Sequence, residues 1–180
     1  MLFRSLYYIY PMKVFGLFLG LLGMFQALYA QNYVLSGTCQ ITRSYCGGVA
    51  PSQEDYARMI APKPYIGKVL YLKKGFKNSF KQKPLAQAVC DSNGCFSFTV
   101  SPGDYCIVQA EHTRSLQAFI KQCQGSHLLS DVNCLKQWWI NGLVSFSVNA
   151  HKQIPVLEFH QACFTPGDIP CIGYTGPMPP

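Results

Sequence analysis

The sequence predicts a mostly β domain: a seven-stranded Greek-key sandwich with a short helical insertion before the last two strands. Three observations lead to this prediction. Apolar and polar residues alternate in short segments, which is the period of a strand with one buried face. Gly, Pro, Asn and Asp separate these segments, as expected for tight turns. Hydrophobic residues make up 49% of the 180 residues and charged residues only 13%, so the chain as a whole is not disordered.

The strand pattern is clearest where two hairpins follow each other. In the stretch DSNGCFSFTVSPGDYCI, Asp91 is placed to cap its own turn and Gly94 supplies a positive φ. Phe96 and the alternate residues after it form one face, and a Pro-Gly pair then reverses the chain. The seven expected strands are 33–42, 67–73, 85–90, 95–100, 105–110, 143–150 and 154–164.

Short helices interrupt the strands at two places. Ser52 is a helix N-cap followed by acidic residues, and this helix must end before Pro62. In the insertion, apolar residues from Leu116 to Cys123 recur at helical spacing. Asp131 is expected to cap a second helix of the insertion, which ends near Gly142.

Residues 1–30 are typical of a secretory signal peptide. Lys13 precedes twelve apolar residues, 14–25, which are too few for a membrane span of about 20 residues. We expect cleavage after Ala30, either from Met1 or from a true start at Met12. The mature protein is then one secreted or periplasmic domain, 31–180, with a Pro-rich C-terminal tail and no stable membrane span. Intact-mass analysis of exported protein should give a chain that begins at Gln31.

All nine cysteines lie in residues 31–180, which favours disulfides in an oxidising compartment. Cys90 and Cys95 flank the turn 91–94, and we expect them to form a cross-strand disulfide. Cys39, at an inward strand position, is the candidate for one buried free thiol. Two alternatives stay open for the C-terminal cysteines. Cys163 and Cys171 pair with each other, or they link the tail to Cys46 or Cys134.

The double-hairpin pattern D-x-x-G-x-F-x-F-x-V-x-P-G-x-Y-x-I resembles the prealbumin-like β-sandwich domains, which include carboxypeptidase-regulatory-like and Cna-B-like modules. The resemblance covers roughly residues 33–111. The segments 45–51 and 170–177 are also similar to small secreted proteins of Bacteroidetes-type bacteria. The resemblance implies a fold and no activity, because its motif carries no catalytic residue. Residues 33–42 lack the lysine from which Cna-B-like modules form an internal Lys–Asn cross-link.

One segment holds the excess positive charge. No acidic residue lies between Tyr56 and Cys90. One interpretation is a patch that attracts an anionic glycan or an acidic protein. The other is a solvated edge where lysines discourage strand pairing. A secreted destination argues against nucleic acid as the partner. The lysines of the expected basic patch are Lys63, Lys68, Lys73, Lys74, Lys77, Lys81 and Lys83.

The motifs favour a binding protein over an enzyme. The sequence has no Gly-x-Ser-x-Gly, no Cys-x-x-Cys and no phosphate loop, and its four histidines lack metal-ligand spacing. Trp138-Trp139 is either a sugar-stacking platform or, as we expect, a packing pair with one partly exposed ring. We therefore predict a non-enzymatic interaction module with no cofactor and no metal. The alternative is a thiol-dependent or metal-binding periplasmic protein that uses the odd cysteine.

Overall fold

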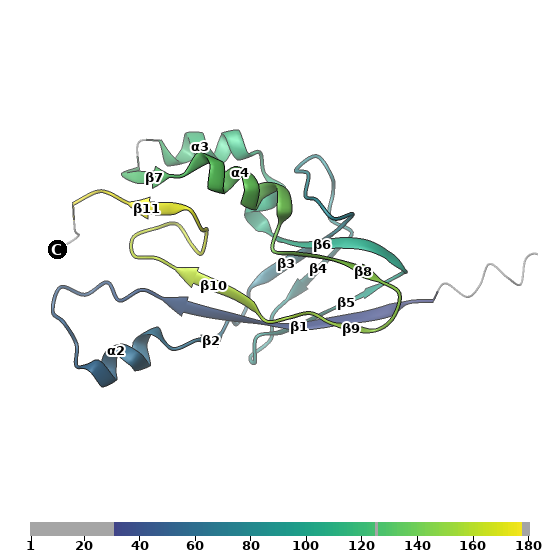
Figure 1. The fold of residues 1–180 in the computed structure, drawn as a ribbon, viewed down its shortest axis with the longest axis horizontal. Helices are drawn as coiled ribbons and strands as arrows, with labels where there is room; N and C mark the ends of the chain where they lie inside the picture. The colour runs from purple at the N-terminus through teal and green to yellow at the C-terminus, as the bar shows by residue number, and fades with distance from the viewer. Residues whose placement is uncertain (1–30, 125, 178–180) are drawn as a thin grey trace, which may run out of the picture. The chain divides into compact units, whose positions relative to one another are not determined.

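The computed structural model describes residues 31–124 and 126–177, which form several β-sheets and three short helices (Figure 1). The expected signal peptide and the end of the Pro-rich tail lie outside the described residues, so cleavage after Ala30 stays a prediction. The elements are β1 (Tyr33–Arg43), α2 (Gln53–Ile60), β2 (Lys63–Pro64), β3 (Val69–Lys74), β4 (Ala86–Val89), β5 (Cys95–Val100), β6 (Gly103–Gln109), the 3₁₀ helix η2 (Ala110–Thr113), α3 (Leu116–Cys123), β7 (Leu128–Ser130), α4 (Val132–Asn141), β8 (Val144–Val148), β9 (Lys152–Gln153), β10 (Leu157–Gln161) and β11 (Ile172–Tyr174).

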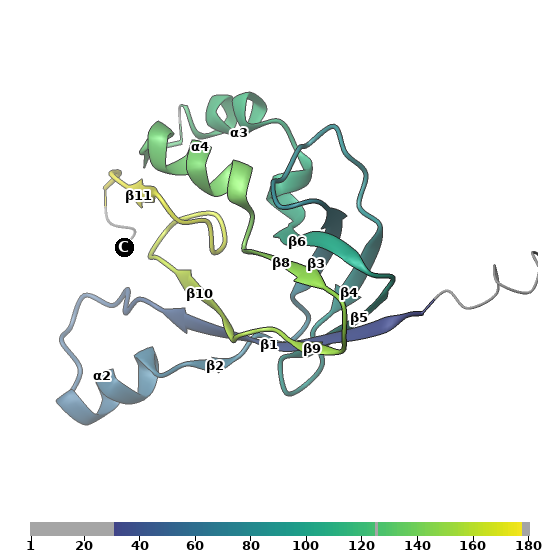
Figure 2. The ribbon, with the colours of Figure 1, turned by 45° about the vertical axis from the view of Figure 1, so that its right-hand side comes forward.

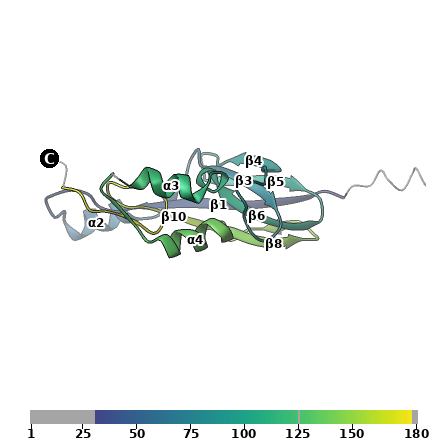
Figure 3. The ribbon, with the colours of Figure 1, turned by 90° about the horizontal axis from the view of Figure 1, so that it is seen from above.

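Strand β1 organises the first, five-stranded sheet along its whole length (Figure 1). Its first half pairs with β5 in the antiparallel sense and with β9 in the parallel sense. Its second half pairs with β2 antiparallel and with β10 parallel. The second sheet is antiparallel throughout, with the order β4-β3-β6-β8 (Figure 3). Strands β7 and β11 form a separate two-stranded sheet.

The two larger sheets share one hydrophobic core, as expected of a β-sandwich. Alternate residues of β5 are buried and exposed, so Phe96, Phe98 and Val100 all face inward. Gly37 in β1 leaves room for this packing, because a Cβ there would lie 2.7 Å from Cζ of Phe96. The buried members of the core are Leu35, Cys39, Ile41, Leu70, Leu72, Cys90, Phe96, Phe98, Val100, Tyr105, Ile107, Phe146, Val148, Ile154, Leu157 and Phe159.

Each of the seven expected strand segments contains a strand, namely β1, β3, β4, β5, β6, β8 and β10. The short strands β2 and β9 and the β7–β11 pair were not predicted, because two or three residues give too little periodicity to detect. The sheets of the described residues therefore hold more than seven strands. The Greek-key connectivity of the whole domain stays a prediction.

The predicted helix caps are confirmed. The side chain of Ser52 accepts a hydrogen bond from the backbone N–H of Asp55. Oδ1 of Asp131 accepts from the backbone N–H groups of Asn133 and Cys134, each at 3.0 Å, and α4 ends at Gly142. Helices α3 and α4 pack with β7 and β11 around a second apolar cluster (Figure 2). Its buried members are Phe119, Cys123, Leu135, Trp139, Ile169 and Ile172.

The expected Cys90–Cys95 disulfide is wrong, because the register of the turn differs by one residue. Asp91, rather than Cys90, faces Cys95, and its backbone N–H donates to the Cys95 carbonyl at 3.0 Å. The chain also changes sheet here, since β4 pairs with β3 and β5 pairs with β1. A shift of one residue reverses the direction of the side chain. Cys90 is therefore buried in the core and Cys95 is exposed, and both are free thiols. The predicted roles of Asp91 and Gly94 in the turn are confirmed.

Within the described residues, no helix is both long and apolar enough to cross a membrane.

Candidate functional site

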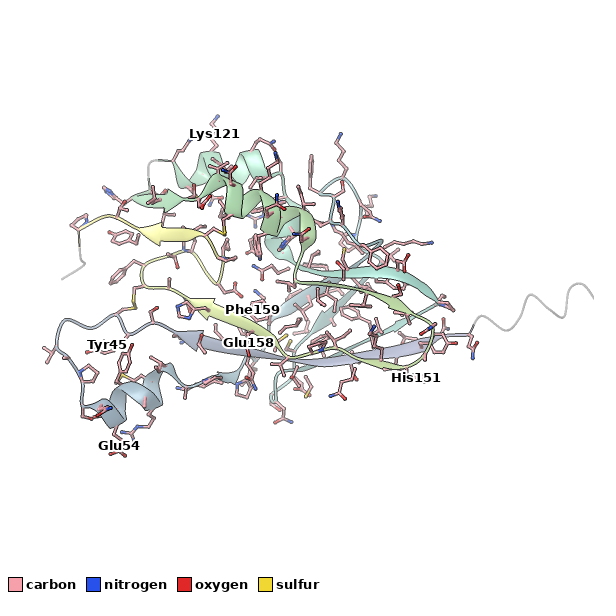
Figure 4. All side chains as sticks on the ribbon, viewed as in Figure 1. Tyr45, Glu54, Lys121, His151, Glu158 and Phe159 are labelled. Atoms are coloured by element: carbon pink, nitrogen blue, oxygen red, sulfur yellow. A yellow bond between two sulfur atoms is a disulfide. The ribbon has the colours of Figure 1, made fainter. Side chains whose placement is uncertain are left out.

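Polar side chains gather beneath the segment that joins β10 to β11, residues 162–171, which we name the C-terminal loop. Both ends of this loop are held by disulfides. Cys163 is bonded to Cys46, which follows β1, and Cys171 is bonded to Cys134 in α4 (Figure 4). Of the two alternatives from the sequence, the link from the tail to Cys46 and Cys134 is therefore confirmed. Two covalent bonds therefore fix both ends of the loop.

The backbone of the C-terminal loop adopts conformations that side chains disfavour. Phe164 and Cys171 have φ values of 61° and 67°, and neither is glycine. Residues held in the left-handed region cost about 1–3 kcal/mol each, and they concentrate at functional sites and ligand clamps. The loop is therefore held in a specific, energetically costly shape by the structure around it.

An ion pair anchors the middle of the C-terminal loop to the sandwich. Nζ of Lys68 lies 2.7 Å from Oδ2 of Asp168, and both side chains are largely buried. The same ammonium group lies 4.7 Å from the ring centroid of Phe159 and 5.0 Å from that of Tyr65. Removing one member of such a pair leaves a buried charge without a partner, which is costly. Asp168 is therefore neutralised by Lys68 and is not an open anionic site.

Tyr65 adds a neutral hydroxyl to this cluster. Burial, together with the nearby carboxylates of Asp168 and Glu111, raises the pKa of Tyr65 to about 12. The backbone N–H of Tyr65 also donates to the Cys39 carbonyl, which ties this segment to β1.

Gln109, the last residue of β6, is the most unusual member of the cluster. Its side chain is fully buried, yet neither the amide nitrogen nor the amide oxygen has a hydrogen-bond partner. A buried polar group without a partner costs about 1–3 kcal/mol, so native proteins rarely retain one. The amide of Gln109 therefore presents one free donor group and one free acceptor.

Gln109 lines a cavity of about 310 Å³ beside the C-terminal loop, which we name the Gln109 cavity. Trp138, His160, Asp168 and Ile169 also line it. Glu158 and Phe159 of β10, both labelled in Figure 4, also line it. A second cavity, of about 660 Å³, lies on the other side of the loop and is lined by Glu111 among others. The loop thus forms a wall common to both cavities.

The histidines near the site are engaged within the protein. Nε2–H of His112 donates to the Trp138 carbonyl at 3.1 Å, and burial lowers the pKa of His112 to about 4. His160 is hydrogen-bonded to the hydroxyls of Thr42 and Ser44, at 2.9 and 3.0 Å. Within residues 31–124 and 126–177, no three metal-ligating side chains are grouped so that they could hold an ion.

The expected basic patch is divided by the fold, and the prediction is wrong for two of its lysines. Lys73 is fully buried and donates to Oδ1 of Asn78 and to the Ser79 carbonyl, each at 2.8 Å. Asn78 in turn donates to the carbonyls of His112 and Trp139. Lys68 is buried in its ion pair with Asp168. The other five, Lys63, Lys74, Lys77, Lys81 and Lys83, are exposed.

The two tryptophans do not form a shared stacking platform. Trp139 is buried and packs against Phe119, with ring centroids 5.2 Å apart. Its indole N–H donates to the Arg114 carbonyl. Trp138 is half-buried, and it lines the Gln109 cavity without Trp139. The expected packing pair with one partly exposed ring is therefore confirmed.

The structure leaves five cysteines free where the sequence predicted one. Cys39 is buried and free, as expected. Burial also raises the pKa values of the Cys39, Cys90, Cys106 and Cys123 thiols, so these groups stay protonated and are weak nucleophiles. Cys95 is the exposed member of the five.

The sequence prediction overlooked Gln109 and Asp168. A signal for Gln109 was present, because along the strand it alternates in phase with Tyr105 and Ile107, two apolar residues that are buried in the core. A glutamine at an inward position of a strand marks either a buried polar network or a site. Asp168 carried no such signal, since its loop is brought over the sandwich by long-range contacts, namely the two disulfides and the ion pair with Lys68.

The chain has weak structural similarity to a solved structure. It is the crystal structure of a DUF3823 family protein from Parabacteroides merdae, with 13% identity and a TM-score of 0.30. The match covers 73% of this chain and 46% of the other, so the chain spans less than half of that protein. Neither protein-family models nor curated proteins give a match.

Proposed function

We propose that the protein is a secreted or periplasmic, non-enzymatic binding module whose Gln109 cavity takes a small neutral ligand. The observation that carries the proposal is Gln109, a fully buried residue that lines a cavity and whose two polar amide atoms have no hydrogen-bond partner. A ligand that pairs with both atoms removes the cost of their burial. The cavity volume of about 310 Å³ lies at the small end of ligand pockets, which span about 300–1,000 Å³.

The charges around the cavity favour a ligand without charge. Asp168 and Glu158 line it, and the nearby cation, Lys68, is already paired with Asp168. An anionic ligand would be repelled by the carboxylate of Glu158 and would find no free cation, because Lys68 is already paired with Asp168. A cationic ligand would have to compete with Lys68 for Asp168.

The polar and aromatic groups favour a ring that carries hydroxyls, such as a neutral sugar. A hydroxyl both donates and accepts, so two adjacent hydroxyls can pair with both atoms of the Gln109 amide. The half-buried Trp138 offers an aromatic surface for the apolar face of such a ring. The C-terminal loop is fixed by two disulfides, so little ordering cost is expected on binding.

The proposed fold of this module is prealbumin-like. The turns between β4, β5 and β6 lie where the sequence predicts them, and two sheets share one core. The predicted double hairpin itself is wrong, because β4 and β6 pair with β3 whereas β5 pairs with β1 in the other sheet. The disulfides join residues 117 and 37 positions apart in the chain. Such links favour an oxidising compartment. The thiol-dependent alternative has less support, because four of the five free thiols are buried.

The proposal is tested by titrating the protein with neutral monosaccharides and with their uronic acid counterparts, with tryptophan fluorescence as the readout. We expect a neutral sugar to change the fluorescence and the matching uronic acid to bind at least tenfold more weakly. Gln109→Met removes the amide at similar volume and should abolish the response. Unchanged sugar affinity in Gln109→Met, or no response to any sugar of the panel, would contradict the proposal.

A stability measurement on the same variant gives a second readout. Gln109→Met should raise the free energy of unfolding by about 1–2 kcal/mol, because it removes an unpaired buried amide. Gln87→Met is the matched control, since Gln87 is exposed in β4 and should change stability by less than about 0.5 kcal/mol. Equal effects of the two substitutions in urea unfolding would mean that Gln109 is not an unpaired buried group.

A further inference from the structure

Two of the free cysteines lie together in the core although they belong to different sheets. Cys39 is in β1 of the five-stranded sheet, and Cys90 directly follows β4 at the edge of the four-stranded sheet. Their exposed fractions are 0% and 3%, and both belong to the core cluster between the sheets. The N–H of Cys39 donates to the Gly94 carbonyl at 2.8 Å, and Gly94 ends the turn that begins directly after Cys90. The pair therefore lies at the point where the two sheets meet.

Backbone hydrogen bonds hold both cysteines in this position. The N–H of Tyr65 donates to the Cys39 carbonyl and the N–H of Gly67 donates to the Cys90 carbonyl, each at 2.9 Å. The N–H of Cys90 donates to the Lys68 carbonyl, also at 2.9 Å. One short segment, residues 65–68, thus contacts both cysteines. A disulfide needs Cα atoms about 4.4–6.8 Å apart, and these backbone contacts keep the two residues close together.

We propose that Cys39 and Cys90 form a third disulfide, which joins the two sheets of the sandwich. In this reaction the two thiols lose two protons and two electrons as the sulfur–sulfur bond forms. The oxidant is a disulfide, either a small-molecule disulfide or a thiol–disulfide oxidoreductase. Its own sulfur–sulfur bond breaks, and it takes up the electrons and protons as two thiols.

The burial of the pair determines when this bond forms. The attacking species in disulfide exchange is the thiolate, and burial raises the pKa values of both thiols above the ordinary range. The closed core also excludes an oxidant. The bond therefore forms during folding, while β1 and β4 are associated but the core is still open.

The other free cysteines are poor partners for either sulfur. Cys95 is exposed on the outer face of β5, and Cys106 lies in β6 opposite Lys73. Cys123 belongs to the separate cluster of α3 and α4. The third disulfide therefore leaves three thiols out of nine cysteines, namely Cys95, Cys106 and Cys123.

The test counts thiols in the full protein folded under oxidising conditions. The protein is unfolded in guanidinium chloride with excess iodoacetamide, and its intact mass gives the number of labelled cysteines. Three labels are expected, and five would overturn the proposal. Non-reducing peptide mapping of the same sample should show the Cys39 peptide linked to the Cys90 peptide. A link from either one to another cysteine would also overturn it.

Two variants separate the possibilities by whether the number of labelled cysteines rises or falls. Cys90→Ala should raise the label count by one, because it releases Cys39 as a thiol. If both cysteines are free in the native protein, the same variant lowers the count by one. Cys123→Ala is the matched control, since it removes a buried free thiol and lowers the count by one in either case. Peptide mapping of the unsubstituted protein decides the matter even where a variant fails to fold.

Discussion

At the scale of the residue, the burial of His112 makes the stability of the folded protein depend on pH. Its side chain is fully buried beside Trp138, with ring centroids 4.0 Å apart. Burial lowers its pKa from 6.5 to about 4. Because the unfolded chain takes up a proton at a higher pH than the folded protein, acid favours unfolding in this range.

We predict that the free energy of unfolding falls by about 3 kcal/mol as the pH falls from 6.5 to 4, and that His112 causes this loss. The contribution is complete above pH 6.5, and it is lost as the pH falls through that window. Urea unfolding at a series of pH values measures it. His112→Phe should flatten the curve between pH 6.5 and 4. Parallel curves for the two proteins would show that other groups cause the acid loss.

Lys73 shows where prediction from sequence fails for single residues. Lysine is almost never fully buried unless it is paired, so its sequence neighbours Lys74 and Lys77 suggested a common exposed patch. Its partners are Asn78 and the Ser79 carbonyl, which lie in the loop that follows β3. That loop closes over Lys73 because Asn78 binds carbonyls of η2 and α4. No local pattern in the sequence encodes this contact.

At the scale of the element, local signals predicted the structure well. The seven strand segments and the caps at Ser52 and Asp131 depend on neighbouring residues, and the structure confirms them. Register failed at the turn after Asp91, because turn chemistry alone did not show that β4 and β5 belong to different sheets. Side chains of a strand alternate with a period of two residues, so this shift of one residue turns Cys90 from the outer face to the core, whereas β5 keeps its expected face.

Removal of the two disulfides should lower the stability of the protein by unequal amounts. In the loop-entropy model, closing 117 residues by Cys46–Cys163 contributes about 5 kcal/mol, and closing 37 residues by Cys134–Cys171 contributes about 4 kcal/mol. We predict that replacing the first pair by alanine destabilises the protein more than replacing the second pair. Guanidinium unfolding of the two double variants gives the comparison. The reverse order would indicate that native contacts, rather than chain entropy, dominate.

At the scale of the whole molecule, the charges separate into two regions. The carboxylates of Asp168, Glu158 and Glu111 lie at the cavities beside the C-terminal loop. Four exposed lysines lie at the end of β3 and in the connection from β3 to β4, namely Lys74, Lys77, Lys81 and Lys83. We therefore propose that an anionic glycan binds the exposed lysines and not the Gln109 cavity.

We predict that heparin, as an anionic probe, binds weakly and that its affinity falls steeply between 50 and 300 mM salt, since exposed charges are screened within about 8 Å at physiological ionic strength. The triple variant Lys74→Gln, Lys77→Gln and Lys81→Gln should weaken this binding at least fivefold, while sugar binding in the Gln109 cavity stays the same. Calorimetry measures both. Heparin binding that ignores salt or the substitutions would mean that these lysines are a solvated edge.

The candidate site is the part of the molecule that the sequence predicted least. Its wall comes from residues far apart in the chain, since Gln109 ends β6 and Asp168 lies in the C-terminal loop. These residues meet because Cys163 and Cys171 are bonded to distant partners. Pairing among nine cysteines is a global property of the fold, so it cannot be deduced from spacing alone.

The two disulfides also determine what proteolysis can do to this protein. Phe164, Pro166, Gly167 and Pro170 are exposed between Cys163 and Cys171, so they are the accessible part of the C-terminal loop. A protease that cuts there leaves the C-terminal fragment bonded through Cys171 to Cys134 and the other cut end bonded through Cys163 to Cys46. The two pieces separate only when a reductant breaks Cys134–Cys171, because Cys46–Cys163 lies wholly within the N-terminal piece. The nicked protein therefore keeps its mass, apart from one added water, and both cut ends of the C-terminal loop stay tied to the domain.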